Sequence, residues 1–269
     1  MLFVCPKCKQ KLNISKDGRA VCEAGHSYDR ARGGYYNLLL SHGGIHGDNK
    51  EMVAARREFL GEGYYRPLAE AISDILCKNT EKNPVVLDAG CGEAYYTDIF
   101  ERALRLRDGE SRVYAYDISK DAVREAVKKN KNITFAVAGS YHMPVPDASV
   151  CALVNIFSPL ALSESARVLS DGGIFVMAIP DEEHLFELKA AIYDTPYKNA
   201  VEDTALEGFR LVSDTPLSYK MELDSQEKIR SLFMMTPYAY RTSRANAGRV
   251  FALSSLAVTA AFRILVYRK

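Results

Sequence analysis

Residues 85–97 read VVLDAGCGEAYYT, and this stretch decides the fold. A β-branched run ends in Asp88, a turn with Gly90 and Gly92 follows, and a helical pattern begins near Tyr95. Glycines at such a turn let the backbone approach a ligand closely, and the start of the helix presents free amide groups. The stretch therefore predicts a strand, a ligand-binding turn and a helix in succession.

Strands and helices alternate on both sides of this stretch. Pro67 suits the first turn of a helix over residues 67–76, and Ser119 is typical of an N-cap before a helix over residues 120–129. Because strands separated by helices form right-handed crossovers, we predict an α/β fold with a parallel, Rossmann-like sheet and a ligand crevice at the strand carboxyl ends. The further strands are predicted at residues 112–117, 133–138, 150–157 and 173–180.

A second acidic residue, Asp117, indicates which class of ligand the glycine turn binds. Asp117 closes the next strand, where its carboxylate can accept hydrogen bonds from two ribose hydroxyls. A dinucleotide site would favour a third glycine at position 95, and this chain has Tyr95. The pair of motifs resembles that of the class I S-adenosylmethionine-dependent methyltransferases, whose ligand has no phosphate. That family commonly has a further glycine where Ala94 stands, and alanine is small enough to fit. A purely structural turn is the alternative.

Four residues near the N-terminus have the spacing of metal ligands. Cys5 and Cys8 are separated by two residues, and Cys22 and His26 by three. Each pair fits a tight turn that directs both side chains to one point, as tetrahedral zinc requires. We expect one structural Zn²⁺ per chain, because protein fills all four positions. Metal binding would supply most of the folding free energy of so short a segment.

The composition divides the chain into three parts. Residues 1–40 are predicted to form the zinc-binding module, residues 41–66 a linker and helix, and residues 67–269 the methyltransferase domain. The stretch SHGGIHGDNK, residues 41–50, is rich in glycine and polar residues and fits a linker. His42 and His46 are therefore interpreted as linker residues, since no second ligand pair accompanies them.

Charge is unevenly distributed along the chain. The formal net charge is +1, yet residues 1–50 carry about +4, residues 224–269 about +6 and residues 51–223 about −9. A polyanion should therefore contact the two ends. No apolar leader precedes Cys5, and the uncharged apolar stretch at residues 250–262 is shorter than the roughly 20 residues of a membrane span. We expect a cytoplasmic protein with no membrane partner.

The parts in this order resemble the bacterial 23S ribosomal RNA guanine-N1 methyltransferases over nearly the whole chain. The resemblance rests on the four zinc-ligand positions and on the stretches GYYNLL, ARREFL, DAGCGEAYYT and MMTPYAYR. It implies an enzyme that uses S-adenosylmethionine to methylate N1 of a guanine in a 23S rRNA hairpin. It also implies a homodimer that holds the hairpin in a basic cleft, with residues 1–40 as an RNA-recognition module. One branch of the family is linked to macrolide resistance.

The resemblance adds residues to the predicted site. It implies that Tyr65, Glu93 and His184 contact S-adenosylmethionine together with Gly92. The full set of predicted cofactor residues is Tyr65, Asp88, Gly90, Gly92, Glu93, Asp117 and His184. The basic residues predicted to contact RNA phosphates are Lys7, Lys9, Lys11, Arg30, Arg32, Arg241, Arg244 and Arg249.

Guanine N1 carries a proton and is a poor nucleophile, so a base would assist the transfer. Asp181, Glu182 and His184 follow the fifth strand, and His184 titrates nearest to neutral pH. A histidine without a role in proton transfer is the favoured interpretation, and no catalytic base is predicted. The topology also places Gly139 and Ser140 along the adenine. Asn155, Phe157 and Pro159 should border a pocket for an extruded base.

Two other functions are compatible with these motifs. The first is a methyltransferase that acts on a small molecule, because the core motifs do not distinguish substrates. The zinc module argues against it, since such an enzyme rarely needs one. The second is a non-catalytic zinc-ribbon RNA-binding protein whose methyltransferase-like domain has lost its cofactor. The presence of Asp88, Gly90, Gly92 and Asp117 argues against that alternative.

Overall fold

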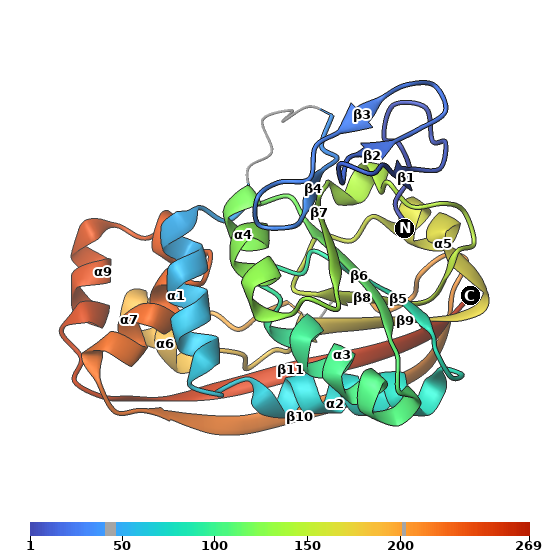
Figure 1. Cartoon of the computed structure of the whole chain (residues 1–269). Coiled ribbons are helices and arrows are strands. Elements are labelled where there is room, and N and C mark those ends of the chain that lie inside the picture. Colours follow the sequence, from blue (N-terminus) through green and yellow to red (C-terminus); the bar gives the residue numbers. More distant parts are fainter. Residues whose placement is uncertain (41–46, 201–202) are drawn as a thin grey trace.

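A computed structural model describes residues 1–40, 47–200 and 203–269 (Figure 1). A small sheet near the N-terminus contains β1 (Asn13–Ile14), β2 (Ala20–Val21) and β3 (Ser27–Tyr28). A large sheet contains, in spatial order, β10 (Arg210–Leu223), β11 (Leu256–Arg268), β9 (Leu169–Pro180), β8 (Val150–Ile156), β5 (Val85–Ala89), β6 (Arg112–Asp117), β7 (Thr134–Val137) and β4 (Tyr36–Asn37).

The centre of the large sheet is parallel, which confirms the predicted α/β class. β5 pairs in parallel with β6 on one side and with β8 on the other. From β5 the chain adds β6 and β7 on one side, and it then crosses back to add β8 on the other side of β5. The order of the strands therefore reverses at β5. In open α/β sheets such a reversal leaves a crevice outside the strand carboxyl ends. The predicted glycine turn follows β5 and lies at that crevice.

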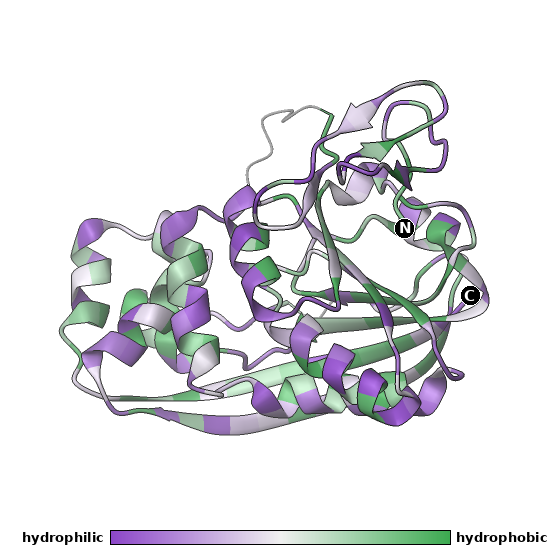
Figure 2. Cartoon of the chain, in the orientation of Figure 1, coloured by the Kyte–Doolittle hydropathy of each residue, from purple (hydrophilic) through white to green (hydrophobic). Residues whose placement is uncertain are grey.

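Helices cover the sheet and carry their polar faces outward (Figure 2). Pro67 lies in the first turn of its helix, and the Ser119 hydroxyl accepts a hydrogen bond from the Ala122 amide at 3.1 Å, so both predicted helix starts are confirmed. The helices next to the parallel strands are α2 (Arg66–Asn79), α3 (Tyr95–Asp108), α4 (Lys120–Lys129) and α5 (Leu162–Val168).

The N-terminal module packs onto the large sheet. Phe3 and Leu12 are fully buried in the same cluster as Leu87, and the Phe3 ring meets the Tyr114 ring edge-on at 5.8 Å. β4 also pairs in parallel with β7, so the module contributes the edge strand of the large sheet. The module and the sheet thus share one apolar core. The predicted boundary at residue 40 stays a prediction.

The predicted linker falls partly outside the described residues. Residues 41–46, including His42 and His46, belong to that part of the chain. Beyond it, the Asn49 side chain accepts from the amides of Glu51 and Met52 and caps α1 (Lys50–Gly61). The Ser119 hydroxyl donates to the Asp48 carbonyl at 2.6 Å. Residues 47–49 are therefore held against the body of the protein.

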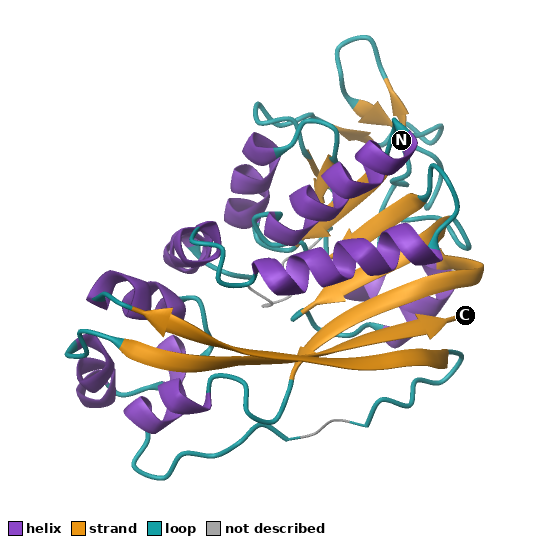
Figure 3. Cartoon of the chain, turned by 90° about the horizontal axis from the view of Figure 1, so that it is seen from below, coloured by secondary structure: helices purple, strands orange, loops and turns teal. Residues whose placement is uncertain are grey.

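The C-terminal third forms structure that the sequence analysis did not assign. β10 and β11 pair as a long antiparallel ribbon, and β11 pairs in turn with β9 (Figure 3). A group of helices packs at one end of this ribbon. These are α1, α6 (Phe186–Ile192), α7 (Gln226–Met234), α8 (Tyr238–Arg241) and α9 (Arg244–Phe251). Among the described residues, no helix combines the length and the apolar character needed to cross a membrane.

Candidate active site

A cavity of about 980 Å³ lies at the carboxyl ends of β5, β6, β8 and β9. Its lining comes from segments between residues 47 and 241, so distant parts of the chain build it together. Phe157 and Pro159 line it as expected, whereas Asn155 is buried and Gly139 and Ser140 are not among the lining residues. All seven predicted cofactor residues line the cavity: Tyr65, Asp88, Gly90, Gly92, Glu93, Asp117 and His184.

The glycine turn is fixed by contacts that a side chain would disturb. Gly90 has φ +88°, and a Cβ on it would lie 2.1 Å from the Ser158 hydroxyl oxygen. The amides of Gly90 and Cys91 both donate to the Tyr116 carbonyl, at 2.9 and 3.0 Å. The turn after β5 is thereby hydrogen-bonded to the end of β6, and it lies directly against the loop after β8.

Asp117 lies where the turn meets the second strand. Its Oδ2 accepts from the Gly92 amide at 2.8 Å, and its Oδ1 accepts from the Ser119 amide at 2.7 Å. Burial raises the pKa of Asp117 above its usual value, and these two N–H groups partly offset the rise. Each carboxylate oxygen can accept more than one hydrogen bond, so Asp117 retains the capacity to accept from ribose hydroxyls.

The two other carboxylates of the predicted site are also buried. Asp88 accepts from the Thr97 hydroxyl at 2.5 Å, and burial raises the pKa of Asp88 to about 7. Glu93 forms an ion pair with Lys129 through Oε2. The other oxygen, Oε1, has no hydrogen-bond partner among the described residues. Because a buried carboxylate oxygen without a partner is costly, Oε1 fits a site that receives a hydrogen-bond donor from a ligand.

His184 is a neutral, buried histidine. Its Nδ1 accepts from the Ala261 amide at 3.2 Å, and its Nε2 lies 3.4 Å from the Tyr65 hydroxyl. Burial and the nearby Lys189 charge lower the pKa of His184 to about 3. Since Nδ1 is an acceptor, the ring proton belongs on Nε2, facing Tyr65. Such a side chain suits ligand binding better than proton abstraction, in line with the interpretation favoured from the sequence.

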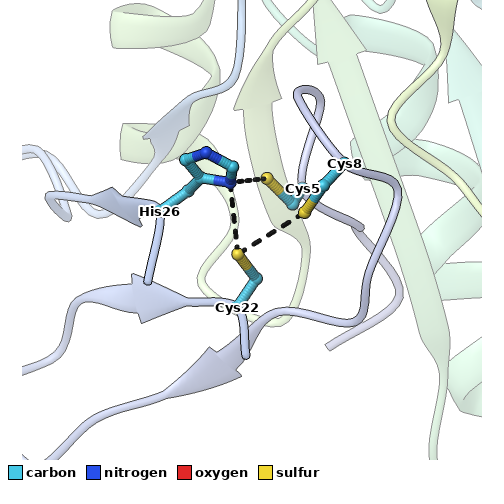
Figure 4. A group of neighbouring side chains, drawn as sticks. All are labelled: Cys5, Cys8, Cys22 and His26. Carbon is cyan, nitrogen blue, oxygen red and sulfur yellow. Dashed lines mark hydrogen bonds between the residues drawn. The ribbon is translucent and has the colours of Figure 1, made fainter. Parts of the chain in front are cut away.

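The four predicted zinc ligands come together in the N-terminal module (Figure 4). Their ligand atoms all lie within 4.8 Å of one another, and His26 Nδ1 is 3.5 Å from the sulfurs of both Cys5 and Cys22. Cys8 and Cys22 are 3.6 Å apart through their sulfurs. Tetrahedral zinc, with Zn–S of about 2.3 Å, places neighbouring ligand atoms roughly 3.5–3.8 Å apart. The cluster therefore fits a closed structural zinc site.

Comparisons with known proteins agree with both halves of this structure. A family model described as "Methyltransferase domain" matches residues 86–173, and one described as "RlmA, N-terminal", a zinc ribbon, matches residues 3–42. A protein of Micromonospora griseorubida, named as a 23S rRNA (guanine-N(1)-)-methyltransferase, is 34% identical over 98% of this chain and 96% of its own length. The chain belongs to the 23S rRNA (guanine-N1)-methyltransferase family.

Other relatives and a solved structure extend this result. The 23S rRNA (guanine(748)-N(1))-methyltransferase of Streptomyces fradiae is 33% identical over 70% of this chain and 66% of its own length. A chain in the complex of the Haloferax volcanii Trm112 methyltransferase activator with a methyltransferase has a TM-score of 0.50 and 18% identity. That match covers 82% of this chain and 99% of the other. The structural likeness shows the fold alone.

The cavity fits S-adenosylmethionine, the cofactor of this methyltransferase family. It is large enough for a nucleoside with an amino-acid tail, and the turn at Gly90 and Gly92 lets a ligand approach the backbone closely. Asp117 can accept from the ribose, and the orphan Oε1 of Glu93 can accept from an N–H or O–H group. A lining rich in carboxylates also favours a ligand that carries a sulfonium and an ammonium.

Sequence reasoning missed several residues of the cavity wall. Asp48 and Arg56 come from the segment that was predicted as linker and helix, and Asn199 comes from the segment after α6. The available signals were the stretches ARREFL and MMTPYAYR, which support the resemblance. Within them only Arg241 has a predicted role, contact with RNA phosphates, whereas the structure places it in the cavity lining. From the second stretch, the cavity receives Met235, Thr236, Pro237, Tyr238 and Arg241.

The turn contains one strained residue. Ala94 has φ +64°, the left-handed conformation that glycine adopts without cost. We expect Ala94→Gly to stabilise the protein by about 0.5–1 kcal/mol, because relief of roughly 1–2 kcal/mol of strain exceeds the entropic cost of glycine. Denaturant unfolding measures the change. Ala103→Gly, inside α3, should instead destabilise by about 1 kcal/mol, and equal losses in both variants would contradict the prediction.

Proposed function

We propose that this chain transfers a methyl group from S-adenosylmethionine to N1 of a guanine in a 23S rRNA hairpin, acting as a homodimer. The observation that carries the proposal is the presence of two sites in one chain: a cavity lined by the predicted cofactor residues, and a Cys/His cluster in a module that packs on the same large sheet. The relatives named for this reaction support it over almost the full length.

The residues of the cavity have distinct proposed roles. When bound, S-adenosylmethionine supplies an electrophilic methyl group on a sulfonium. Asp117 holds the ribose, the backbone at Gly90 and Gly92 borders the amino-acid tail, and Tyr65 and His184 contact the same tail from the opposite wall. Because the groups are held in place by hydrogen bonds within the protein, most of the rate acceleration can come from alignment of the reacting atoms.

An extruded guanine would enter between aromatic walls. Phe157 lines the cavity with its side chain 43% exposed, an unusual state for phenylalanine, and its φ is +54°. Its amide donates to the Ala178 carbonyl at 3.1 Å, which holds this strained backbone in place. Strained, exposed residues of this kind concentrate at functional sites. We propose that Phe157 stacks on the purine, with Tyr96 and Tyr238 as further walls.

No side chain is assigned as the base. Asp181 and Glu182 are not among the residues that line the cavity, and His184 has the lowered pKa described above. We propose that catalysis relies on positioning and on removal of water from the reacting groups, with the N1 proton released to solvent.

A hollow beside the zinc module suits the phosphates of RNA. It has a volume of about 590 Å³ and lies between the module and the end of α4. Four of its lining residues are cations that have no carboxylate partner among the described residues: Lys16, Arg30, Arg32 and Lys131. Most of the other arginines form ion pairs with carboxylates. Asp17, which also lines it, is paired with Arg19 at 2.7 Å. By contrast, Arg249, predicted to contact RNA, pairs with Asp194 at 2.5 Å.

The hollow gives a measurable prediction for RNA binding. Changing Lys16, Arg30, Arg32 and Lys131 to glutamine should weaken binding of the rRNA hairpin and lower the slope of log K against log salt by about 0.7–0.9 per lost phosphate contact. Fluorescence anisotropy over a salt series measures both. Lys82→Gln, an exposed residue far from the hollow in sequence, is the control. An unchanged slope would contradict the assignment of this surface.

The reaction itself is tested in cells with and without the gene. N1 methylation blocks Watson–Crick pairing, so primer extension on 23S rRNA should stop at one guanine only when the gene is present. An Asp117→Ala variant should lose the stop, because it lacks the proposed ribose contact. Mass spectrometry of the nucleosides identifies the methylated atom. Methylation of a small-molecule panel with unmodified rRNA would favour the first rival function, and no cofactor binding by calorimetry would favour the second.

The dimer rests on the family resemblance. Sedimentation equilibrium of the zinc-loaded chain should give twice the mass of 29.9 kDa. A single-chain mass at micromolar concentration would contradict it.

A further inference from the structure

The cavity is acidic, with few cations in its wall. Among the described lining residues the only arginines are Arg56 and Arg241, and lysine is absent. The carboxylates that line the cavity are Asp48, Asp88, Glu93 and Asp117. This distribution of charge favours the sulfonium and the ammonium of S-adenosylmethionine but repels its carboxylate. A zwitterionic tail therefore needs one cationic position in the wall.

Arg56 occupies such a position. It projects from α1, where its Nη1 lies 2.5 Å from Asp48 Oδ2, and its Nη2 donates to the Met235 carbonyl at 3.2 Å. Nη1 also lies 3.7 Å from where a Cβ would stand on Gly92. The guanidinium thus reaches over the cofactor turn while it is anchored on two other walls of the cavity. Arg241, by contrast, is an exposed residue at the end of α8.

The guanidinium has donors to spare. It carries five N–H groups in one plane, and the two contacts above leave others free. Planar pairing with a carboxylate is the interaction for which arginine is best suited, and it is stronger when both groups are partly withdrawn from water. The Arg56 side chain is 32% exposed, so it is partly withdrawn but still accessible from the cavity.

We propose that Arg56 binds the carboxylate of the methionine tail of S-adenosylmethionine, and that Asp48 orients the guanidinium for this contact. The inference rests on the proposed cofactor role of the cavity and deepens it. It assigns the tail to the gap between the Gly92 turn and the segment at Met235, and so fixes the direction in which the cofactor lies. It also gives residues 48–56, N-terminal to the predicted methyltransferase domain, a part in cofactor binding.

The test compares two ligands that differ only in this carboxylate. Isothermal calorimetry is performed on the zinc-loaded full chain with S-adenosylmethionine and with decarboxylated S-adenosylmethionine. For the wild type we expect S-adenosylmethionine to bind about 10- to 100-fold more tightly than decarboxylated S-adenosylmethionine, because a charged hydrogen-bonded pair usually contributes that much affinity. Arg56→Met should remove that preference by weakening the first ligand while leaving the second within about twofold. Asp48→Asn should remove part of it.

Arg57→Met is the matched control. Arg57 is the next residue on α1, pairs with Glu125 at 2.7 Å and does not line the cavity, so both affinities should stay unchanged. Equal weakening of both ligands by Arg56→Met would overturn the proposal, because it would show that Arg56 supports the cavity without contacting the carboxylate. No weakening of either would overturn it as well. A wild type that binds neither ligand would instead contradict the proposed cofactor.

Discussion

Gly90→Ala is expected to abolish cofactor binding and to lower the free energy of unfolding by about 2–5 kcal/mol. The added methyl group would lie 2.1 Å from the Ser158 hydroxyl oxygen and 2.6 Å from the Ser158 Cβ. Either β8 and its following loop or the turn itself must move. The substitution also forces alanine into a φ of +88°, which costs roughly 1–2 kcal/mol, and overpacking costs a further 1–3 kcal/mol. Denaturant unfolding and calorimetry with S-adenosylmethionine measure the two effects.

Gly109→Ala is a control that separates the cost of backbone strain from the cost of steric overlap with Ser158. Gly109 has φ +85°, close to that of Gly90, but a Cβ there would meet no atom within 4 Å. This variant should lose only about 1–2 kcal/mol and bind the cofactor normally. Adding Ser158→Gly to Gly90→Ala should restore part of the lost stability, because it removes the atoms that the new methyl group meets. If the two alanine variants behaved alike, close contact between the β5 and β8 loops would not be the cause.

Removal of zinc is expected to unfold the N-terminal module. Binding of structural zinc supplies roughly 10–16 kcal/mol in small zinc domains, far more than the short strands β1, β2 and β3 can provide. Chelation, or Cys8→Ser, should therefore expose residues in the segment 5–28 to proteolysis and lower the melting temperature. Metal analysis should find one zinc per chain before chelation and less than one in the variant.

The core shared by the module and the sheet extends the effect of zinc loss. Phe3 and Leu12 are fully buried beside strands of the large sheet, so unfolding of the module would expose that face to water. Cys77→Ser is the control, since Cys77 lies in α2, outside the metal cluster. If chelation left the protease pattern unchanged, or if both serine variants lost zinc equally, the four residues would not form the site.

The glycine turn and the metal cluster could be predicted because they are encoded locally. The β-branched run before Asp88, the glycines after it and the two close pairs of ligands each specify a turn within a few residues. Asp117 could be added because parallel strands bring their carboxyl ends to one edge of the sheet. Residues carried by the resemblance, such as Tyr65 and His184, proved to be neighbours in the cavity wall, with the Tyr65 hydroxyl 3.4 Å from His184 Nε2, although they are 119 positions apart in the chain.

The C-terminal ribbon had no comparable local signal. Most residues of β10 are exposed, so its sequence, RLVSDTPLSYKMEL, lacks the continuous apolar run of a buried strand. The apolar stretch at residues 250–262 begins at the end of α9 and continues into β11. Its apolar composition therefore does not reveal where the helix ends and the strand begins. The segment at residues 235–241, which follows β10 in the chain, lines the cavity, and β11 joins the ribbon to β9.

The sequence by itself determined the parallel centre of the α/β sheet, the cofactor turn and the four-ligand metal cluster, because each follows from a local pattern: strands alternating with helices, a glycine turn, and two close pairs of ligands. Only the tertiary structure decided that Arg56 meets Asp48 and the Met235 carbonyl, and that a Cβ on Gly90 would strike Ser158. Such pairings join segments up to 179 residues apart, and they follow from how the sheet, the ribbon and the helices bury their apolar surfaces together.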